Sequence, residues 1–380
     1  MNEIVKRKPY VKYIIAGVVC FLFLIVITLL IYFLTRKKKG IPFYLTYGTG
    51  GIWYSNDGMK WTNCSKESVT DIAYNGVDTF LGVGGGKVFY SNDGKNWTLY
   101  ASNIFGGGTE NNSSYNFITY NGVDTWVVGS MFRTGNNLAY SNDGKKWTPV
   151  TNIFVGVWGG DYVSSIVYNG VDTWVAVGSD IGYSKDGKKW TLSNIEVKSV
   201  AYNGIDTWIA IGDNVTVHSK DGETWSTVQP ILTYTSIIVY NGVDTWVAVG
   251  DSGESDVEYY INYSKNNGVT WGKVTNIFSV NDVAYNGIDT WVAVRDTYNN
   301  GGSSISYSKD GALSWNNGTD IFSGGAGTSV AYNGIDTWVA VGSVTTKSIV
   351  AYSKDGIIWN TGTGINDDSI RLVTKIFTLQ

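Results

Sequence analysis

The chain has 380 residues, 14% of them aromatic, with 47 Gly and only 4 Pro, a composition that favours many short strands joined by tight turns. Residues 1–40 hold eight of the 28 Lys/Arg and one of the 32 Asp/Glu, so the other 340 residues carry 20 basic and 31 acidic side chains. Such an acidic region repels phosphate backbones, which excludes nucleic acid as an expected partner. One histidine, His218, and two cysteines exclude metal sites built on several His or Cys ligands, and no metal or cofactor is expected.

The N-terminal part predicts a membrane anchor. A basic tail over residues 1–12 precedes YIIAGVVCFLFLIVITLLIYFL at 13–34, in which no residue is charged. As a helix rising about 1.5 Å per residue these 22 residues would cover about 33 Å, enough to span a bilayer core. A cleaved signal peptide is the competing interpretation, but the apolar run is too long and RKKKG offers no small-residue cleavage site. We therefore expect a single transmembrane helix over 13–35 and a basic linker over 36–41.

The orientation of this helix is left open by charge, because four basic residues precede it and four follow it. Acceptor sequons for N-glycosylation would suit an exported domain, although a chain rich in Asn, Ser and Thr also produces them by chance. They begin at Asn63, Asn96, Asn111, Asn112, Asn214 and Asn317. We expect the domain after the linker to be extracellular or lumenal.

Two motifs alternate along residues 42–380. The first, Tyr-Asn-Gly-Val/Ile-Asp-Thr, has its tyrosine at Tyr74, Tyr120, Tyr168, Tyr202, Tyr240, Tyr285 and Tyr332. The second is an aromatic residue followed by Ser-x-Asp-Gly-x-x-Trp, and its first residue is Tyr54, Tyr90, Tyr140, Tyr183, His218, Tyr263, Tyr307 or Tyr352. Successive units lie 34 to 50 residues apart, a period typical of propeller blades. Because a catalytic group is needed once and a blade turn in every blade, the repetition indicates a structural role.

Each unit predicts four strands joined by Asn-Gly and Asp-Gly hairpin turns. The apolar TWVAVG strings suit strands buried on both faces, as between neighbouring blades. Seven units are complete, and a first fragment over residues 41–62 lacks one strand that the C-terminal SIRLVTKIFTL can supply. We therefore expect an all-β propeller of four-stranded antiparallel blades over 42–380, closed by pairing of the two chain ends, with eight blades and seven as the alternative.

The second motif resembles the Asp-box, or bacterial neuraminidase repeat, whose pattern is Ser-x-Asp-x-Gly-x-Thr-Trp. SKNNGVTW at 264–271 and SKDGALSW at 308–315 have that spacing, and the other six copies are one residue shorter. The resemblance implies a β-propeller of the sialidase-like superfamily in which Ser and Asp fasten a turn and Trp packs beneath it. The residues that take the Asp place are Asp57, Asp93, Asp143, Asp186, Asp221, Asn266, Asp310 and Asp355.

The connections that vary in length predict the functional face, since binding surfaces form from variable loops on a constant scaffold. They are residues 100–116, 130–138, 153–163, 251–261 and 295–303. The candidate binding residues are Trp158, Arg133, Arg295, Asp251, Glu254, Asp256, Glu258 and Tyr298. Arg295 replaces the Gly that ends TWVAVG elsewhere and is expected at the mouth of the channel. His218 is expected in or near the core.

These features predict a membrane-anchored binding module for a protein or glycan. Two alternatives are a sialidase-like glycoside hydrolase and a structural or assembly protein. Sialidases use three arginines, and the propeller region has three, Arg133, Arg295 and Arg371. The family's early Arg-Ile-Pro is here Gly40-Ile41-Pro42, and no distinctive Tyr or Glu context accompanies the arginines. We therefore expect no catalytic residues, because function is argued from a site rather than from a fold.

Overall fold

The computed structural model describes residues 41–106, 116–131, 136–151, 153–154, 162–213, 215–228, 237–249, 261–277, 279–297, 302–345, 347–365 and 372–379. The predicted basic tail and transmembrane helix lie outside these residues. Within these ranges no helix is both long and apolar enough to cross a membrane.

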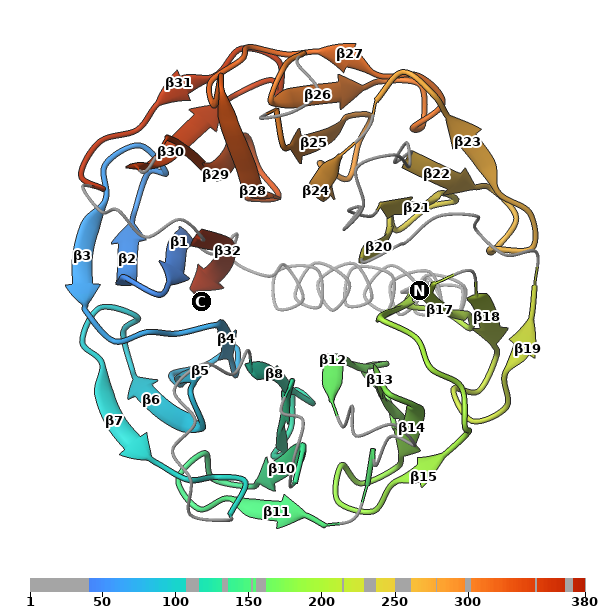
Figure 1. The fold of residues 1–380 in the computed structure, drawn as a ribbon. Helices are drawn as coiled ribbons and strands as arrows, with labels where there is room; N and C mark the ends of the chain where they lie inside the picture. The colour runs from blue at the N-terminus through green and yellow to red at the C-terminus, as the bar shows by residue number, and fades with distance from the viewer. Residues whose placement is uncertain are drawn as a thin grey trace, which may run out of the picture. The chain divides into compact units, whose positions relative to one another are not determined.

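The described strands form eight four-stranded sheets arranged as the blades of a ring (Figure 1). From the centre of the ring outward, blade 1 contains β32 (Leu372–Leu379), β1 (Ile41–Gly48), β2 (Gly51–Ser55) and β3 (Thr62–Ser65). Blade 2 contains β4 (Asp71–Tyr74), β5 (Phe80–Gly84), β6 (Lys87–Ser91) and β7 (Thr98–Ala101). Blade 3 contains β8 (Asn116–Tyr120), β9 (Trp126–Ser130), β10 (Leu138–Ser141) and β11 (Thr148–Val150). Blade 4 contains β12 (Val163–Tyr168), β13 (Trp174–Gly178), β14 (Ile181–Ser184) and β15 (Thr191–Leu192).

The second half of the ring repeats this arrangement. Blade 5 contains β16 (Ser199–Tyr202), β17 (Trp208–Gly212), β18 (Val215–Ser219) and β19 (Ser226–Thr227). Blade 6 contains β20 (Ile237–Tyr240), β21 (Trp246–Val249), β22 (Ile261–Ser264) and β23 (Gly272–Val274). Blade 7 contains β24 (Val280–Tyr285), β25 (Trp291–Arg295), β26 (Ile305–Ser308) and β27 (Asn316–Asn317). Blade 8 contains β28 (Gly325–Tyr332), β29 (Trp338–Val344), β30 (Lys347–Ser353) and β31 (Asn360–Thr361).

The second strand of each complete blade forms the core of the ring. In β13 every residue from Trp174 to Gly178 is buried, as the unbroken apolar run predicts for a strand covered by blades on both sides. Tyr168 and Trp174 are cross-strand partners, and their ring centroids lie 4.8 Å apart. Because aromatic pairs of this kind stabilise a hairpin beyond their area burial, the first motif joins turn and core in one segment.

The two ends of the strands form two different faces. At one end, the first and second strands of blades 2 to 8 are joined by five residues of the first motif, as in 203–207. The third and fourth strands of every blade are joined there by six or seven residues of the second motif. We call this the turn face. The opposite end carries the hairpins between second and third strands and the connections between blades, and we call it the loop face. Since strands alternate in direction, every hairpin of one kind must emerge on the same face.

The ring closes through its two chain ends. β32 lies beside β1 as the innermost strand of blade 1, which confirms the predicted pairing and gives eight blades rather than seven. Phe377 of β32 packs edge-on against Phe80 of blade 2, with ring centroids 5.4 Å apart. Lys375 forms an ion pair with Asp71 of blade 2. The C-terminal strand therefore contacts the next blade as well as its own.

Glycines of the second motif allow neighbouring blades to approach closely. Gly187 has a φ of 71°, and a Cβ there would lie 3.0 Å from Val127 and 3.2 Å from Thr125 of the preceding blade. A Cβ at Gly144 would likewise lie 2.9 Å from the Leu81 side chain of the preceding blade. A Cβ at Gly58 of blade 1 would lie 3.0 Å from the Val339 side chain of blade 8. The motif thus needs glycine twice over, for a left-handed backbone and for close approach of the next blade.

Gly187→Ala is expected to lower the free energy of unfolding by about 1 to 3 kcal/mol, because the left-handed conformation and the contact with Val127 both oppose a methyl group. Gly170→Ala is the matched control, since Gly170 has a φ of 80° but a Cβ there would meet no atom within 4 Å. Chemical denaturation of both variants separates the two costs. An equal loss at both positions would show that blade contact contributes nothing.

Candidate functional site

The Asn-Gly turn is fastened by its own side chains. In blade 5, Asn203 Oδ1 accepts the backbone N–H groups of Ile205, Asp206 and Thr207, each at 2.9 Å. The Asp206 carboxylate in turn accepts hydrogen bonds from Lys220 Nζ and from the Thr207 hydroxyl, each at 2.8 Å. Hydrogen bonds from the side chains of Lys220, Thr207 and Asn203 lower the pKa of Asp206 to about 2. These polar groups therefore already have structural partners within the turn.

The Ser-x-Asp turn is fastened in a comparable way. Asp221 Oδ1 accepts the N–H groups of Glu223 and Thr224, each at 2.8 Å, and the Ser219 hydroxyl at 2.8 Å. Trp225 Nε1 donates to the Gly222 carbonyl at 3.2 Å. All eight residues at the Asp position accept a hydrogen bond from the motif's serine and from turn N–H groups. They are Asp57, Asp93, Asp143, Asp186, Asp221, Asn266, Asp310 and Asp355.

Blade 7 departs from this pattern. Ala312 takes the place of the glycine and adopts a φ of 68°, a conformation that costs an L residue about 1 to 2 kcal/mol. Within the described residues, Trp315 Nε1 is buried without a hydrogen-bond partner, whereas Trp225 Nε1 reaches the Gly222 carbonyl. Trp291 Nε1 of the same blade also lacks one there. Among the described copies, the turn of blade 7 therefore leaves the most tryptophan N–H groups without a hydrogen-bond partner.

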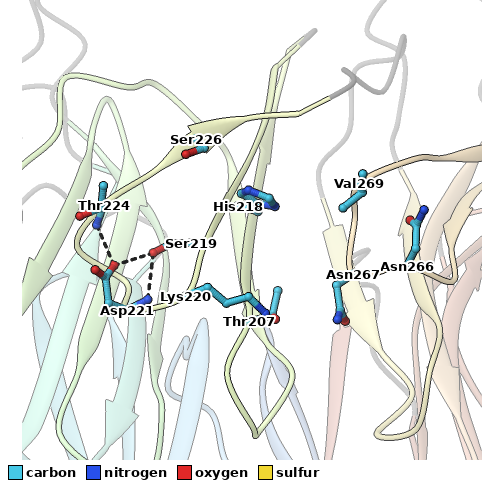
Figure 2. Close-up of a pocket in the computed structure, with 10 residues that line it drawn as sticks. All are labelled: Thr207, His218, Ser219, Lys220, Asp221, Thr224, Ser226, Asn266, Asn267 and Val269. Carbon is cyan, nitrogen blue, oxygen red and sulfur yellow. Dashed lines mark hydrogen bonds between the residues drawn. The ribbon is translucent and has the colours of Figure 1, made fainter.

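A pocket of about 370 Å³ opens between blades 5 and 6 on the turn face (Figure 2). Figure 2 shows His218 and Ser226 on one side, facing Val269 and Asn267 of the next blade. The lining is completed by Thr207, Ser219, Lys220, Asp221, Thr224 and Asn266. His218 stands where the other copies have Tyr, and Asn267 is the extra residue of the longer motif, with a φ of 56°. These departures distinguish this junction from the others in sequence.

The charged and amide groups that line this pocket already have partners within the protein. Lys220 is engaged by Asp206 and Thr207, and the Asp221 carboxylate by the backbone of its own turn. The amide of Asn267 accepts Trp246 Nε1 at 3.4 Å. No second carboxylate faces Asp221 among the lining residues, so the paired acid and base of a glycosidase are not present in this pocket.

Arg295 is the one predicted binding residue that the structure describes. It ends β25, the second strand of its blade, and its side chain is 3% exposed. Its guanidinium lies over Gly302, where a Cβ would come within 3.4 Å of it. Burial lowers the pKa of Arg295, while the charges of Asp320 and Asp296 act in the opposite direction. The sequence predicts Arg295 at the mouth of the channel, and the structure places it, buried, at the end of β25 that lies toward the loop face.

The other predicted binding residues lie outside the described residues. They are Trp158, Arg133, Asp251, Glu254, Asp256, Glu258 and Tyr298, and the third arginine, Arg371, lies outside as well. The structure therefore does not test whether the arginines or the acidic loop come together. Within the described ranges, no cluster of three or more His, Cys, Asp or Glu residues could hold a metal ion.

Two aspartates on innermost strands were not predicted as notable. Asp282 of β24 accepts the Ser329 hydroxyl at 2.9 Å and the Val330 N–H at 3.0 Å, both from β28 of the next blade. Asp71 of β4 takes the same strand position and accepts the Ile118 N–H of β8 at 2.9 Å. The innermost strand of a blade has backbone groups on one edge that no further strand pairs. Each of these carboxylates accepts a hydrogen bond from such an N–H group on the innermost strand of the next blade. A charged residue three positions before the motif tyrosine was the signal that could have found them.

Cys64 is half-buried and donates to the Ile52 carbonyl at 3.3 Å. Burial raises the pKa of the Cys64 thiol to about 12. Cys64 is the one cysteine of the propeller region. Because the thiolate is the reactive form, alkylation of Cys64 by iodoacetamide near pH 8 is expected to be about 100-fold slower in the folded than in the unfolded protein. Mass spectrometry of a time course measures both rates. Similar rates would show that the thiol is accessible and normally acidic.

Several solved structures align with this chain. The C-terminal WD40 domain of Sif2 aligns with a TM-score of 0.53 at 10% identity, over 80% of this chain and 85% of that one. A eukaryotic initiation factor aligns with a TM-score of 0.47 at 9% identity, over 87% and 85% of the two chains. A chain of the nidogen/laminin complex aligns with a TM-score of 0.40 at 11% identity, over 60% and 91%. The likeness to the WD40 domain shows the propeller fold alone.

No protein-family model and no curated protein matches the chain. A β-propeller is consistent with a binding or interaction module. Function must therefore be argued from the two faces of this ring.

Proposed function

We propose that the chain is a single-pass membrane protein whose β-propeller binds a protein or glycan ligand through the loop face. The observation that carries this proposal is the contrast between the two faces. On the turn face every first-to-second connection has five residues, whereas on the loop face β13 and β14 are separated by two residues and β21 and β22 by eleven, 250–260. Variation confined to one face is how repeat proteins build binding surfaces.

We also propose that the second motif is a shortened Asp-box. Its support is the hydrogen bonding of the turns, in which Ser and Asp side chains hold the backbone and Trp donates to the turn carbonyl, as at Asp221 and Trp225. A fastening role in every blade makes the motif part of the scaffold. It therefore gives no support to sialidase activity, and the buried Arg295 does not add any.

The membrane anchor rests on the uncharged residues 13–34, and the propeller is placed on the extracellular or lumenal side. Glycosylation and protease protection of the intact chain in microsomes test both statements. A chain extracted by carbonate, or an unmodified and fully digested propeller, would contradict the anchor or the orientation respectively.

The loop face is tested by a graft between two blades. Residues 168–178 and 240–250 are identical, so replacing residues 251–260 by the dipeptide Ser-Asp, which follows Gly178 in blade 4 as Ser179 and Asp180, copies the short hairpin of blade 4 onto blade 6. A glycan array and an affinity pull-down are first performed with the intact chain to obtain a ligand. The graft is expected to weaken binding of that ligand at least about tenfold with unchanged thermal unfolding.

The matched control changes the turn face instead, replacing Glu223 and Thr224 by the Lys-Lys of blade 4. Binding is expected to be unaffected, since the backbone of this turn makes the hydrogen bonds with Asp221. Loss of binding in this control together with full binding by the graft would reverse the assignment of the two faces. Turnover of a sialoside by the wild-type chain, abolished by Arg295→Lys, would replace binding by hydrolysis as the function.

A further inference from the structure

A ring of exposed apolar residues lies on the turn face. The fourth residue of the first motif is Val or Ile in every copy, and in six of the seven its exposed fraction is 68 to 77%. We call this set the apolar ring, and it consists of Val77, Val123, Val171, Ile205, Val243, Ile288 and Ile335. Ile335 is less exposed, at 37%.

The fold does not require an apolar side chain at these positions. The turn uses only backbone groups of the residue. The Ile205 N–H donates to Asn203 Oδ1 at 2.9 Å, and the Val243 carbonyl accepts a hydrogen bond from the Tyr240 hydroxyl at 2.6 Å. Another position of the turn face, the first residue after Asp-Gly, changes freely between copies, from Lys188 to Glu223 to Ile357. A side chain that stays β-branched and apolar while fully accessible indicates a contact outside the chain.

Exposed apolar residues are concentrated on this face. Of the twelve large hydrophobic residues that are exposed in the described part of the chain, ten lie on the turn face. They are the apolar ring together with Val269, Leu313 and Ile358 of the second motif. The two others are Leu99 in β7 and Met131 at the loop face. One face of the propeller is therefore distinctly more apolar than the rest.

The negative charge of the aspartate that follows each residue of the apolar ring is neutralised by a lysine in most copies. The aspartate of the first motif is paired with the lysine of the second in five blades, at N···O distances from 2.8 to 4.0 Å. The pairs are Lys185–Asp172, Lys220–Asp206, Lys265–Asp244, Lys309–Asp289 and Lys354–Asp336. Long lysine side chains can keep their charge in the headgroup region while apolar neighbours go deeper.

The chain enters the propeller at this same face. Tyr44 pairs with Ser55 as Trp126 pairs with Ser141, so Ile41, three residues before Tyr44, takes the register position of Val123. The predicted transmembrane helix ends at residue 35, and the linker to Ile41 can span at most about 20 Å when fully extended. If the helix is anchored as proposed, the linker keeps the point of entry at Ile41 within that distance of the bilayer.

We propose that the turn face docks on the lipid bilayer, with the apolar ring inserted at the boundary between headgroups and acyl chains. The proposal rests on the membrane anchor proposed above and adds an orientation to it. The propeller lies flat on the membrane, and the loop face points away from it toward the ligand. A bilayer fits this surface because a ring of small apolar side chains with lysines around it is how peripheral proteins meet lipid.

Single-cysteine probes in the intact chain test this docking. On a background of Cys20→Ser and Cys64→Ser, the variants Val171→Cys, Ile205→Cys and Ile288→Cys carry an environment-sensitive fluorophore on the turn face. Ser102→Cys, an exposed residue between β7 and β8, is the matched control on the loop face. In phosphatidylcholine vesicles, the turn-face probes are expected to be quenched about twofold or more by brominated lipid, and the control not at all.

The variant Val171→Ser/Ile205→Ser/Ile288→Ser adds a second measurement, with the probe at Val243→Cys. Its quenching is expected to fall to the level of the loop-face control, while thermal unfolding stays unchanged because the substituted side chains are mostly exposed. Retained quenching in this variant would overturn a role for the apolar ring.

Three other outcomes would also overturn the docking. If the chain floats with vesicles but its turn-face probes stay in water, the anchor is correct and the docking is wrong. If the chain does not float with vesicles, the anchor itself fails. If the probes are shielded without quenching by brominated lipid, and dilution of the protein reverses this, a second copy rather than lipid covers the ring.

Discussion

Removal of β32 is expected to unfold the whole propeller rather than one blade. A chain that ends at Ile365 lacks the innermost strand of blade 1, and with it the contact of Phe377 with Phe80 and the ion pair of Lys375 with Asp71. β1 then has an open sheet edge at the centre of the ring. We expect a loss above about 5 kcal/mol, comparable to the whole net stability of a domain. Circular dichroism during thermal unfolding of residues 41–365 and 41–380 measures it.

A circular permutant is the matched control for this truncation. It opens the chain between β3 and β4, within residues 66–70, and joins Leu379 to Ile41 through a copy of the Asn-Gly-Val-Asp-Thr turn. All four strands of blade 1 are then continuous, so cooperative unfolding near the wild-type midpoint is expected. If the truncated chain also unfolds cooperatively at that midpoint, closure by β32 is not what holds the ring together.

The fold could be predicted because each blade repeats the same local physics. Asn-Gly and Asp-Gly turns, the Tyr168 and Trp174 pair and the apolar run after it are all encoded within a few residues. Ring closure could also be predicted, because a fragment with three strands and a C-terminal strand complete one blade. The burial of Arg295 is not predictable in this way, since its neighbours Gly302 and Asp320 belong to two different connections that no repeat describes.

The candidate site could be predicted only as a face. A variable loop has no internal copy to compare with, so its contacts cannot be inferred from repetition. The apolar ring was missed for the opposite reason. Val171 and Ile205 belong to the most regular motif of the chain, and such regularity indicates a structural role for the whole motif. Only their exposure, 77% and 73%, separates them from the buried residues beside them.

Asp282 is expected to make the propeller more stable at mildly acidic pH than above neutrality. Burial between two innermost strands raises its pKa from 3.8 to about 6, although the Val330 N–H, the Ser329 hydroxyl and the Val283 N–H favour the carboxylate. A carboxyl whose pKa is higher in the folded protein contributes its full stability below about pH 4 and loses it as pH rises through about 6. The shift corresponds to about 2 to 3 kcal/mol.

The variant Asp282→Asn removes this titration but keeps the shape of the side chain. Relative to wild type it is expected to gain about 2 to 3 kcal/mol as pH rises from about 4 to about 8, even if its lost acceptor lowers stability throughout. Comparing the two proteins cancels the opposite effect of turn aspartates such as Asp206, whose pKa is lowered to about 2. Asp71→Asn, at the same strand position, is the control, and it should weaken the protein at neutral pH because Lys375 loses its partner. Urea denaturation at several pH values measures both, and a difference between Asp282→Asn and wild type that does not change with pH would contradict the raised pKa.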